Sequence, residues 1–163
     1  MATWQRILMD KQVQHGDNTS TQNWGTGLSL SATGSFNGDI CKIGTAPVTT
    51  VSGKVYALVG GTWILADKDT VAHGKALLGV STGSAISSSF PTNGFLIKGL
   101  VRVNAGPLNS PTVGDVIFMG DSGDTDGSAP TGVGDIVRPL GYWVHNTNKT
   151  MLFDPDKTWV ELV

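Results

Sequence analysis

The sequence predicts an all-β fold, a compact β-barrel or sandwich of about nine short strands, preceded by an extended N-terminal arm. From about Phe36 onward, short runs of Val, Ile, Leu and aromatic residues are separated by clusters of Gly, Asp, Asn, Ser and Pro. This alternation is typical of strands and turns. Glycine makes up 22 of the 163 residues and is spread along the whole chain, which indicates many turns. A chain of this length forms one domain with a substantial core.

The expected strands follow one another from residue 39 to the end of the sequence. They are residues 39–43, 54–59, 62–65, 76–81, 94–103, 116–119, 135–144, 150–153 and 158–162. Gly60 and Gly61 predict a two-residue hairpin, because glycine takes the positive φ angles that such a turn needs. A helix of one or two turns is expected within residues 67–75, with Asp67 or Asp69 as its N-cap.

The first 35 residues differ from the rest of the chain. Residues 11–35 are rich in Gln, Asn, Thr, Ser and Gly and hold too few apolar residues to form a core layer. We therefore assign residues 1–35 to an arm and residues 36–163 to a β domain. Such an arm is ordered by its own domain or by a neighbouring subunit, and a frayed terminus is the alternative. The apolar residues that cannot bury themselves within it are candidate partner contacts: Trp4, Ile7, Leu8 and Trp24.

Charge and hydropathy exclude several classes of function. Lys and Arg total only 11 and the net charge is -2, so we expect no nucleic-acid partner. The longest apolar run, within residues 94–103, spans about ten residues, whereas a membrane helix needs about twenty, so we expect no membrane partner. Residues 1–11 lack the apolar core of a secretory signal, which indicates synthesis in a cytoplasm. Cys41 is the only cysteine and is expected to be a small buried apolar residue.

The stretch GDSGDTDG, residues 120–127, fits three different patterns. GDSG surrounds the nucleophile of trypsin-like serine proteases, but this chain is shorter than a two-barrel protease and has Asp124 where that family has another Gly. Asp121, Asp124 and Asp126 form a candidate calcium loop, although the EF-hand register of ligands does not fit. Gly and Asp also make ordinary turns. We expect an exposed polar turn, with no cofactor.

The sequence contains no pattern that predicts catalysis. The histidines lie in separate polar segments without zinc-binding spacing and are expected on the surface (His15, His73 and His145). No glycine-rich phosphate-binding motif occurs. We therefore expect that the protein is not an enzyme. The remaining tryptophans lie in strand-like runs and are expected in the core (Trp63, Trp143 and Trp159).

A family resemblance covers residues 53–163. It is carried by the segments GKVYALVGGTWILADKDT, ALLGVSTGS, GFLIKGLVRV, PTVGDVIFMG, GDIVRPLGYWV and MLFDPDKTWVELV. This succession resembles the carboxyl-terminal β domain of virion structural proteins of tailed bacteriophages, and its order of strands is similar to capsid decoration (cement) proteins of the lambda type. Pro139 departs from the aliphatic residue usual in that family. Because proline removes a ladder donor, we expect an edge or a bulge there.

The resemblance implies a structural role in a phage particle. A decoration protein would be a homotrimer on the capsid surface that binds the major capsid protein and stabilises the head shell. A tail, baseplate or fibre component with a host-surface-binding role is the alternative. A calcium-dependent, lectin-like module is a third class, and a chelator-sensitive melting temperature would identify it.

Overall fold

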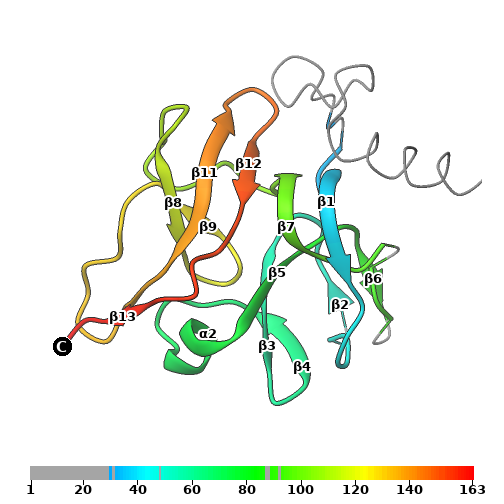
Figure 1. The fold of residues 1–163 in the computed structure, drawn as a ribbon, viewed down its shortest axis with the longest axis horizontal. Coiled ribbons are helices and arrows are strands. Elements are labelled where there is room, and N and C mark those ends of the chain that lie inside the picture. Colours follow the sequence, from blue (N-terminus) through cyan, green and yellow to red (C-terminus); the bar gives the residue numbers. More distant parts are fainter. Residues whose placement is uncertain (1–29, 31, 48, 87–88, 92) are drawn as a thin grey trace, which may run out of the picture.

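The computed structural model describes residues 30, 32–47, 49–86, 89–91 and 93–163, and it confirms an all-β fold (Figure 1). The arrangement is an open, curled sheet that resembles half of a barrel. The elements are β1 (Phe36–Cys41), β2 (Thr49–Thr50), β3 (Val55–Val59), β4 (Thr62–Leu65), α2 (Val71–Lys75), β5 (Leu77–Ser81), β6 (Ala85–Ile86), β7 (Phe95–Arg102), β8 (Val116–Met119), β9 (Thr125–Asp126), β10 (Ile136–Val137), β11 (Pro139–His145), β12 (Thr150–Phe153) and β13 (Val160–Glu161).

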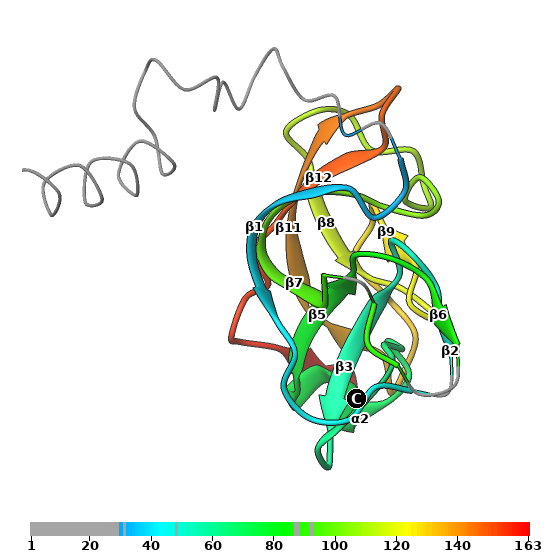
Figure 2. The same ribbon diagram turned by 90° about the vertical axis from the view of Figure 1, so that its right-hand side faces the viewer.

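Strand β7 joins the two halves of the main sheet. Nine strands form this sheet, in the order β4-β3-β5-β7-β12-β11-β8-β9 with β1 also paired to β7. Strand β5 pairs with Phe95 and Leu96 at the start of β7, whereas β12 pairs with residues 99–102 at its end. Figures 1 and 2 show β8, β11 and β12 on one side of β7 and β3, β4 and β5 on the other. Two further pairs, β10-β13 and β2-β6, lie outside this sheet.

The core consists of two clusters of buried side chains on the two faces of the β3-β5-β7 region. The larger cluster is made of Val55, Ala57, Ala66, Leu78, Val80, Leu96, Val101, Val103, Ile117, Met119, Ile136, Leu140, Trp143, Met151 and Phe153. The smaller one holds Tyr56, Trp63 and Phe95. Trp63 and Trp143 are buried, as predicted, and Trp159 is partly buried against the larger cluster. Burial of these large apolar side chains stabilises the fold.

The smaller cluster is closed by the segment after β1. The ring of Trp63 stacks on Phe95 with centroids 4.3 Å apart. The indole Nε1 of Trp63 donates to the Ile43 carbonyl at 2.8 Å, and the backbone N–H of Trp63 donates to Thr45. Thr45 also forms a parallel bridge with Thr62 at the outer side of β4. Residues 42–45 therefore cover the aromatic cluster and protect the edge of β4.

The observed strands match most of the predicted ones and correct others. The predicted strands at 62–65, 116–119 and 150–153 have the predicted bounds, whereas the first strand lies earlier than residues 39–43. The predicted strand at 135–144 is wrong in extent, because β10 and β11 are separate strands. They separate because β10 pairs with β13 while β11 pairs with β8 and β12. Gly60 and Gly61 have φ angles of 55° and 82°, which confirms the hairpin.

Two local predictions are corrected by the backbone. The residue before α2 is Thr70, and no side chain caps the helix, so the prediction of Asp67 or Asp69 as N-cap is wrong. At Pro139 the predicted bulge is confirmed by a register shift against β8. The alternative of an edge strand is wrong, because β11 lies between β12 and β8. Proline is tolerated there because it is the first residue of the strand.

The residues just before β1 already belong to the folded body. Leu30 is 8% exposed, and its carbonyl accepts a hydrogen bond from Arg102 Nη1 at 3.2 Å. Gly34 donates its N–H to the Arg102 carbonyl at 2.8 Å, which extends the β1-β7 ladder beyond β1. Among the described residues, no helix has the length and apolar character needed to cross a membrane.

Candidate functional site

The GDSGDTDG stretch is a turn that is docked onto the body. Ser122 and Gly123 both have positive φ angles, 48° and 76°. The buried Gly123 donates its N–H to the Ala66 carbonyl at 2.6 Å, and its own carbonyl accepts the N–H of Val55 at 2.9 Å. A Cβ on Gly123 would lie 2.8 Å from the Val55 carbonyl oxygen. Glycine is required here because both the φ angle and the space exclude a side chain.

The three aspartates of the candidate calcium loop contact different partners. Asp121 forms an ion pair with Lys68 at 2.8 Å. Asp124 pairs with Lys54 at 2.6 Å. Asp126 accepts hydrogen bonds from Asn109 Nδ2 at 2.7 Å and from the Ser128 N–H at 2.9 Å. The structure therefore does not bring the three carboxylates around one point.

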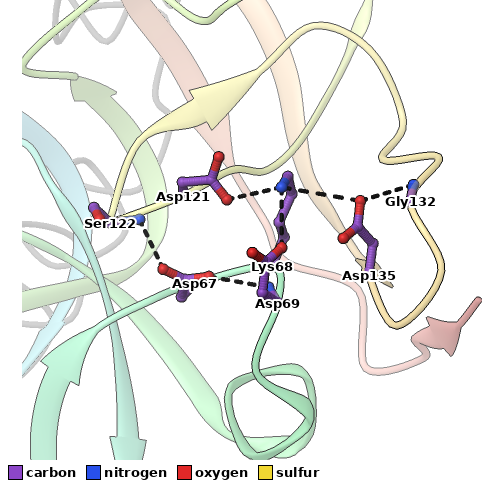
Figure 3. Close-up of polar contacts among 7 residues, drawn as sticks. All are labelled: Asp67, Lys68, Asp69, Asp121, Ser122, Gly132 and Asp135. Atoms are coloured by element: carbon purple, nitrogen blue, oxygen red, sulfur yellow. Dashed lines mark hydrogen bonds and ion pairs between the residues drawn. The ribbon is translucent and has the colours of Figure 1, made fainter.

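Lys68 is the centre of the polar network that holds this turn (Figure 3). Its Nζ atom lies 2.8 Å from Asp121, 3.0 Å from Asp69 and 3.9 Å from Asp135. The hydrogen bonds that the Lys68 ammonium donates to Asp121 and Asp69 raise its pKa. The hydrogen bond from Lys68 lowers the pKa of Asp69 in return. The Lys68 backbone also bonds to both neighbouring segments, donating to the Gly120 carbonyl and accepting the Ile136 N–H.

Oxygen atoms of Asp67, Asp69 and Asp121 lie within 4.8 Å of one another, a spacing that suits a hard cation. Two backbone donors already bind the Asp67 carboxylate: the N–H of Asp69 at 3.0 Å and the N–H of Ser122 at 3.2 Å. The ammonium of Lys68 bonds to the other two carboxylates. The ammonium of Lys68 therefore already occupies the position between two of the carboxylates and offsets part of the charge of this cluster. The arrangement joins the β4-α2 connection to the 120–123 turn, which is a structural role.

Arg138 is a second buried connection that the sequence did not reveal. Arg138 is only 6% exposed, and its guanidinium donates hydrogen bonds to three backbone carbonyls. Nε bonds to Asp156 at 2.8 Å, and Nη1 bonds to Gly74 at 2.8 Å and to Ala76 at 2.6 Å. Burial lowers the pKa of Arg138, while the nearby Asp156 acts in the opposite direction. The side chain fixes the end of α2 to the C-terminal segment, where a cation also favours the helix dipole.

The histidines and the cysteine are not assembled into a reactive site in the described part of the chain. His73 lies buried on α2, so the expectation that it is on the surface is wrong. His145 is half-buried and accepts the Asn148 N–H at 3.1 Å, and His15 lies outside the described residues. Burial raises the pKa of the Cys41 thiol, which lowers its reactivity. Cys41 packs at the side of the aromatic cluster but is only partly buried, whereas the sequence predicts a buried residue.

The predicted partner contacts Trp4, Ile7, Leu8 and Trp24 lie outside the described residues. The described surface carries exposed apolar side chains of its own. Val133, Val160 and Val163 lie along the β10-β13 pair and the segments next to it, and Ile40 and Ile43 lie on β1 and just after it. The sequence does not distinguish these exposed apolar residues from buried ones, because the strands carry apolar residues on both faces.

A concave feature lies on the outer face of the β8-β11-β12 region. It has a volume of about 480 Å³ and contains the exposed ring of Tyr142 beside Asp154, Asp156 and Lys157. These residues are inconspicuous in the sequence, because the pocket forms only when β11 and the segment after β12 come together. Comparisons with protein-family models, with curated protein sequences and with solved structures find no match.

Proposed function

We propose that this chain is a non-enzymatic structural protein of a tailed-bacteriophage virion, a decoration protein that stabilises the head shell. In this proposal it binds the major capsid protein, acts as a homotrimer and lies on the capsid surface. The family resemblance of residues 53–163 supports the proposal, and the all-β architecture agrees with it. The main observation in its favour is the open edge of β1, the strand that follows the arm.

The chain enters the body at an open strand edge. Leu30 is buried and held by Arg102, and β1 begins six residues later. β1 pairs with β7 along one edge, and no described strand pairs with its other edge. Four of its six residues are exposed. Since an open edge can add a strand from another chain, the β1 edge and the residues that lead into it are a suitable surface for a neighbouring subunit.

Several weak contacts are sufficient for such a role. The arm contains Trp4, Ile7, Leu8 and Trp24, which supply apolar contact area to a neighbour. Once one site of a trimer is attached, the other sites bind at a high effective concentration, so overall avidity exceeds the affinity of each contact. The protein then stabilises a shell by adding noncovalent contacts between capsomers, without chemistry.

The proposal is tested with capsid shells that lack this protein. The full chain is expected to bind them in many copies per head and to raise the temperature at which the shell disassembles. A chain that begins at Leu30 keeps the described body and is expected to bind at least about tenfold more weakly, because it lacks the arm contacts. Equal binding of the two chains would show that the arm is not the contact.

The alternative of a tail, baseplate or fibre component is favoured by a single observation, the exposed pocket around Tyr142. Immunogold labelling of virions separates the two locations. Label on the head supports decoration, and label on the tail supports the alternative.

A further inference from the structure

The pocket around Tyr142 has an aromatic floor formed by the outer face of three strands. Tyr142 pairs with Leu152 on β12 and with Val116 on β8, so the three side chains point to the same face of the sheet. Trp143, the next residue along β11, points into the core on the opposite face. The Tyr142 side chain is 52% exposed, whereas its two neighbours are half-buried. The ring is therefore a flat apolar surface that the fold leaves open to solvent.

The wall of the pocket is formed by residues 154–157, whose backbone is hydrogen-bonded to β11. Asp154 donates its N–H to the Leu140 carbonyl at 2.9 Å, and Asp156 donates its N–H to the Pro139 carbonyl at 3.0 Å. The Asp156 carbonyl also accepts the buried Arg138 guanidinium. Pro139 and Pro155 line the pocket, and proline restricts the backbone. The pocket is thus held in shape by the protein before any ligand arrives, which reduces the entropy cost of binding.

The polar groups of the pocket are balanced in charge. Asp154 pairs with Lys98 at 3.1 Å, and the Asp156 carboxylate accepts the Thr158 N–H at 2.9 Å. Lys157 also lines the pocket. The carboxylates of Asp154 and Asp156 and the ammonium groups of Lys98 and Lys157 carry equal and opposite formal charge, so the pocket has no formal net charge to favour a phosphate or a cation. It still offers strong hydrogen-bond acceptors and a strong donor at its rim.

This combination selects one class of ligand. A neutral sugar ring has an apolar C–H face that packs on an aromatic ring and hydroxyl groups that bond to carboxylates and ammonium groups. The volume of about 480 Å³ lies within the range of small-molecule pockets, about 300–1,000 Å³. We propose that the Tyr142 pocket binds a neutral saccharide, with the pyranose ring on Tyr142 and its hydroxyl groups on Asp154, Asp156 and Lys157. This binding is independent of whether the protein lies on a head or a tail.

Saturation-transfer NMR on the full chain tests this proposal. The neutral probes are the methyl glycosides of glucose, galactose, mannose and N-acetylglucosamine. The charged probes are N-acetylneuraminic acid and choline. At least one neutral glycoside is expected to bind with a Kd of about 1 mM, with saturation strongest at its ring C–H protons, and both charged probes at least about tenfold more weakly. Absence of binding by all four neutral glycosides would overturn the proposal, and so would equal or tighter binding of a charged probe.

Variants connect the signal to the pocket. Tyr142→Ala is expected to weaken binding at least about tenfold, because it removes the aromatic floor. Val133→Ala truncates an exposed side chain elsewhere on the surface and is expected to bind as the natural chain does. If Tyr142→Ala binds as tightly as the natural chain, the assignment is wrong. If Tyr142→Ala fails to fold, Asp154→Asn serves as the test of the binding site, because it keeps the shape of the pocket. Unchanged binding in Asp154→Asn would then overturn the proposal.

Discussion

Replacing Arg138 with Met is expected to cause one of the largest losses of stability available to a single substitution outside the apolar core. The guanidinium donates to the carbonyls of Asp156, Gly74 and Ala76 at 2.6–2.8 Å from a side chain that is almost fully buried. A buried carbonyl that loses its donor costs about 1–3 kcal/mol. The bond to Gly74 is buried, whereas those to Ala76 and Asp156 are partly buried and cost less. Relief of the desolvation of the charge offsets part of this loss, which leaves a net reduction of about 2–4 kcal/mol in the free energy of unfolding.

The measurement is urea denaturation at pH 7, followed by the fluorescence of the buried tryptophans. For a chain of this length each kcal/mol lowers the Tm by about 2–4 °C, so a decrease of roughly 5–15 °C is expected in a thermal scan. Lys157→Met removes an exposed cation and is the matched control, with an expected change within about 0.5 kcal/mol. A loss below about 1 kcal/mol in Arg138→Met would show that the three hydrogen bonds contribute little beyond the desolvation they require.

Gly123, Lys68 and the pH dependence of stability provide further tests. Gly123→Ala should lower the free energy of unfolding by more than about 2 kcal/mol, because it adds a clash with a backbone carbonyl to the cost of a positive φ. Gly60→Ala, where no atom lies within 4 Å, should cost only about 1–2 kcal/mol. Lys68→Met should lower stability by about 1 kcal/mol, and millimolar calcium should raise the Tm of this variant and leave the natural chain unchanged. Hydrogen bonds lower the pKa values of Asp115 and Asp156 below 3.8, so their contribution is complete above that pH and is lost as the pH falls. The pKa of Lys68 is raised above 10.5, so its contribution is complete below that pH and is lost at higher pH. Burial raises the pKa of Cys41 above 9.0 and that of Tyr56 above 10.0, so stability also declines as the pH rises above about 9. The free energy of unfolding should therefore be constant between about pH 5 and pH 9.

Each of these tests has an outcome that contradicts its basis. Equal losses in the two glycine variants would show that the docked turn adjusts around a side chain. A calcium-dependent Tm in the natural chain would show that the Lys68 ammonium leaves room for a cation, and would support the calcium-dependent class. A steady change of stability between pH 5 and pH 9, measured by urea denaturation at intervals, would indicate that other groups dominate the pH dependence.

The strands could be predicted where local sequence alone decides them. The 62–65 and 150–153 segments are bounded by turn residues on both sides, so their limits were predicted correctly. Tertiary contacts determine the rest. Arg138 divides an apolar run into two strands, because its side chain turns inward to bind carbonyls from distant segments. The short strands β2, β6 and β9 were not predicted, since a two-residue strand leaves almost no pattern in a sequence.

The site residues illustrate the same limit. The Asp residues of the 120–127 stretch are conspicuous in the sequence, but their partners Lys54 and Lys68 come from more than fifty residues away. The sequence indicates that each carboxylate needs a cation or a hydrogen-bond donor nearby. Which cation it pairs with depends on the fold. Tyr142 looks like any strand aromatic in the sequence. Its exposure follows from its register against β8 and β12, which only the structure supplies.

The position of β7 between the two halves of the sheet also determines when the nascent chain can fold. Residues 99–102 of β7 leave the ribosome about fifty residues before β12, their ladder partner, which at about 5–20 residues per second is a delay of roughly 3–10 s. During this delay an apolar strand has one edge without its native partner, and such edges promote aggregation. Pairing between distant segments also slows folding itself. A chain cut before Thr150 would keep that edge open permanently, so the solubility of the whole protein depends on the arrival of β12.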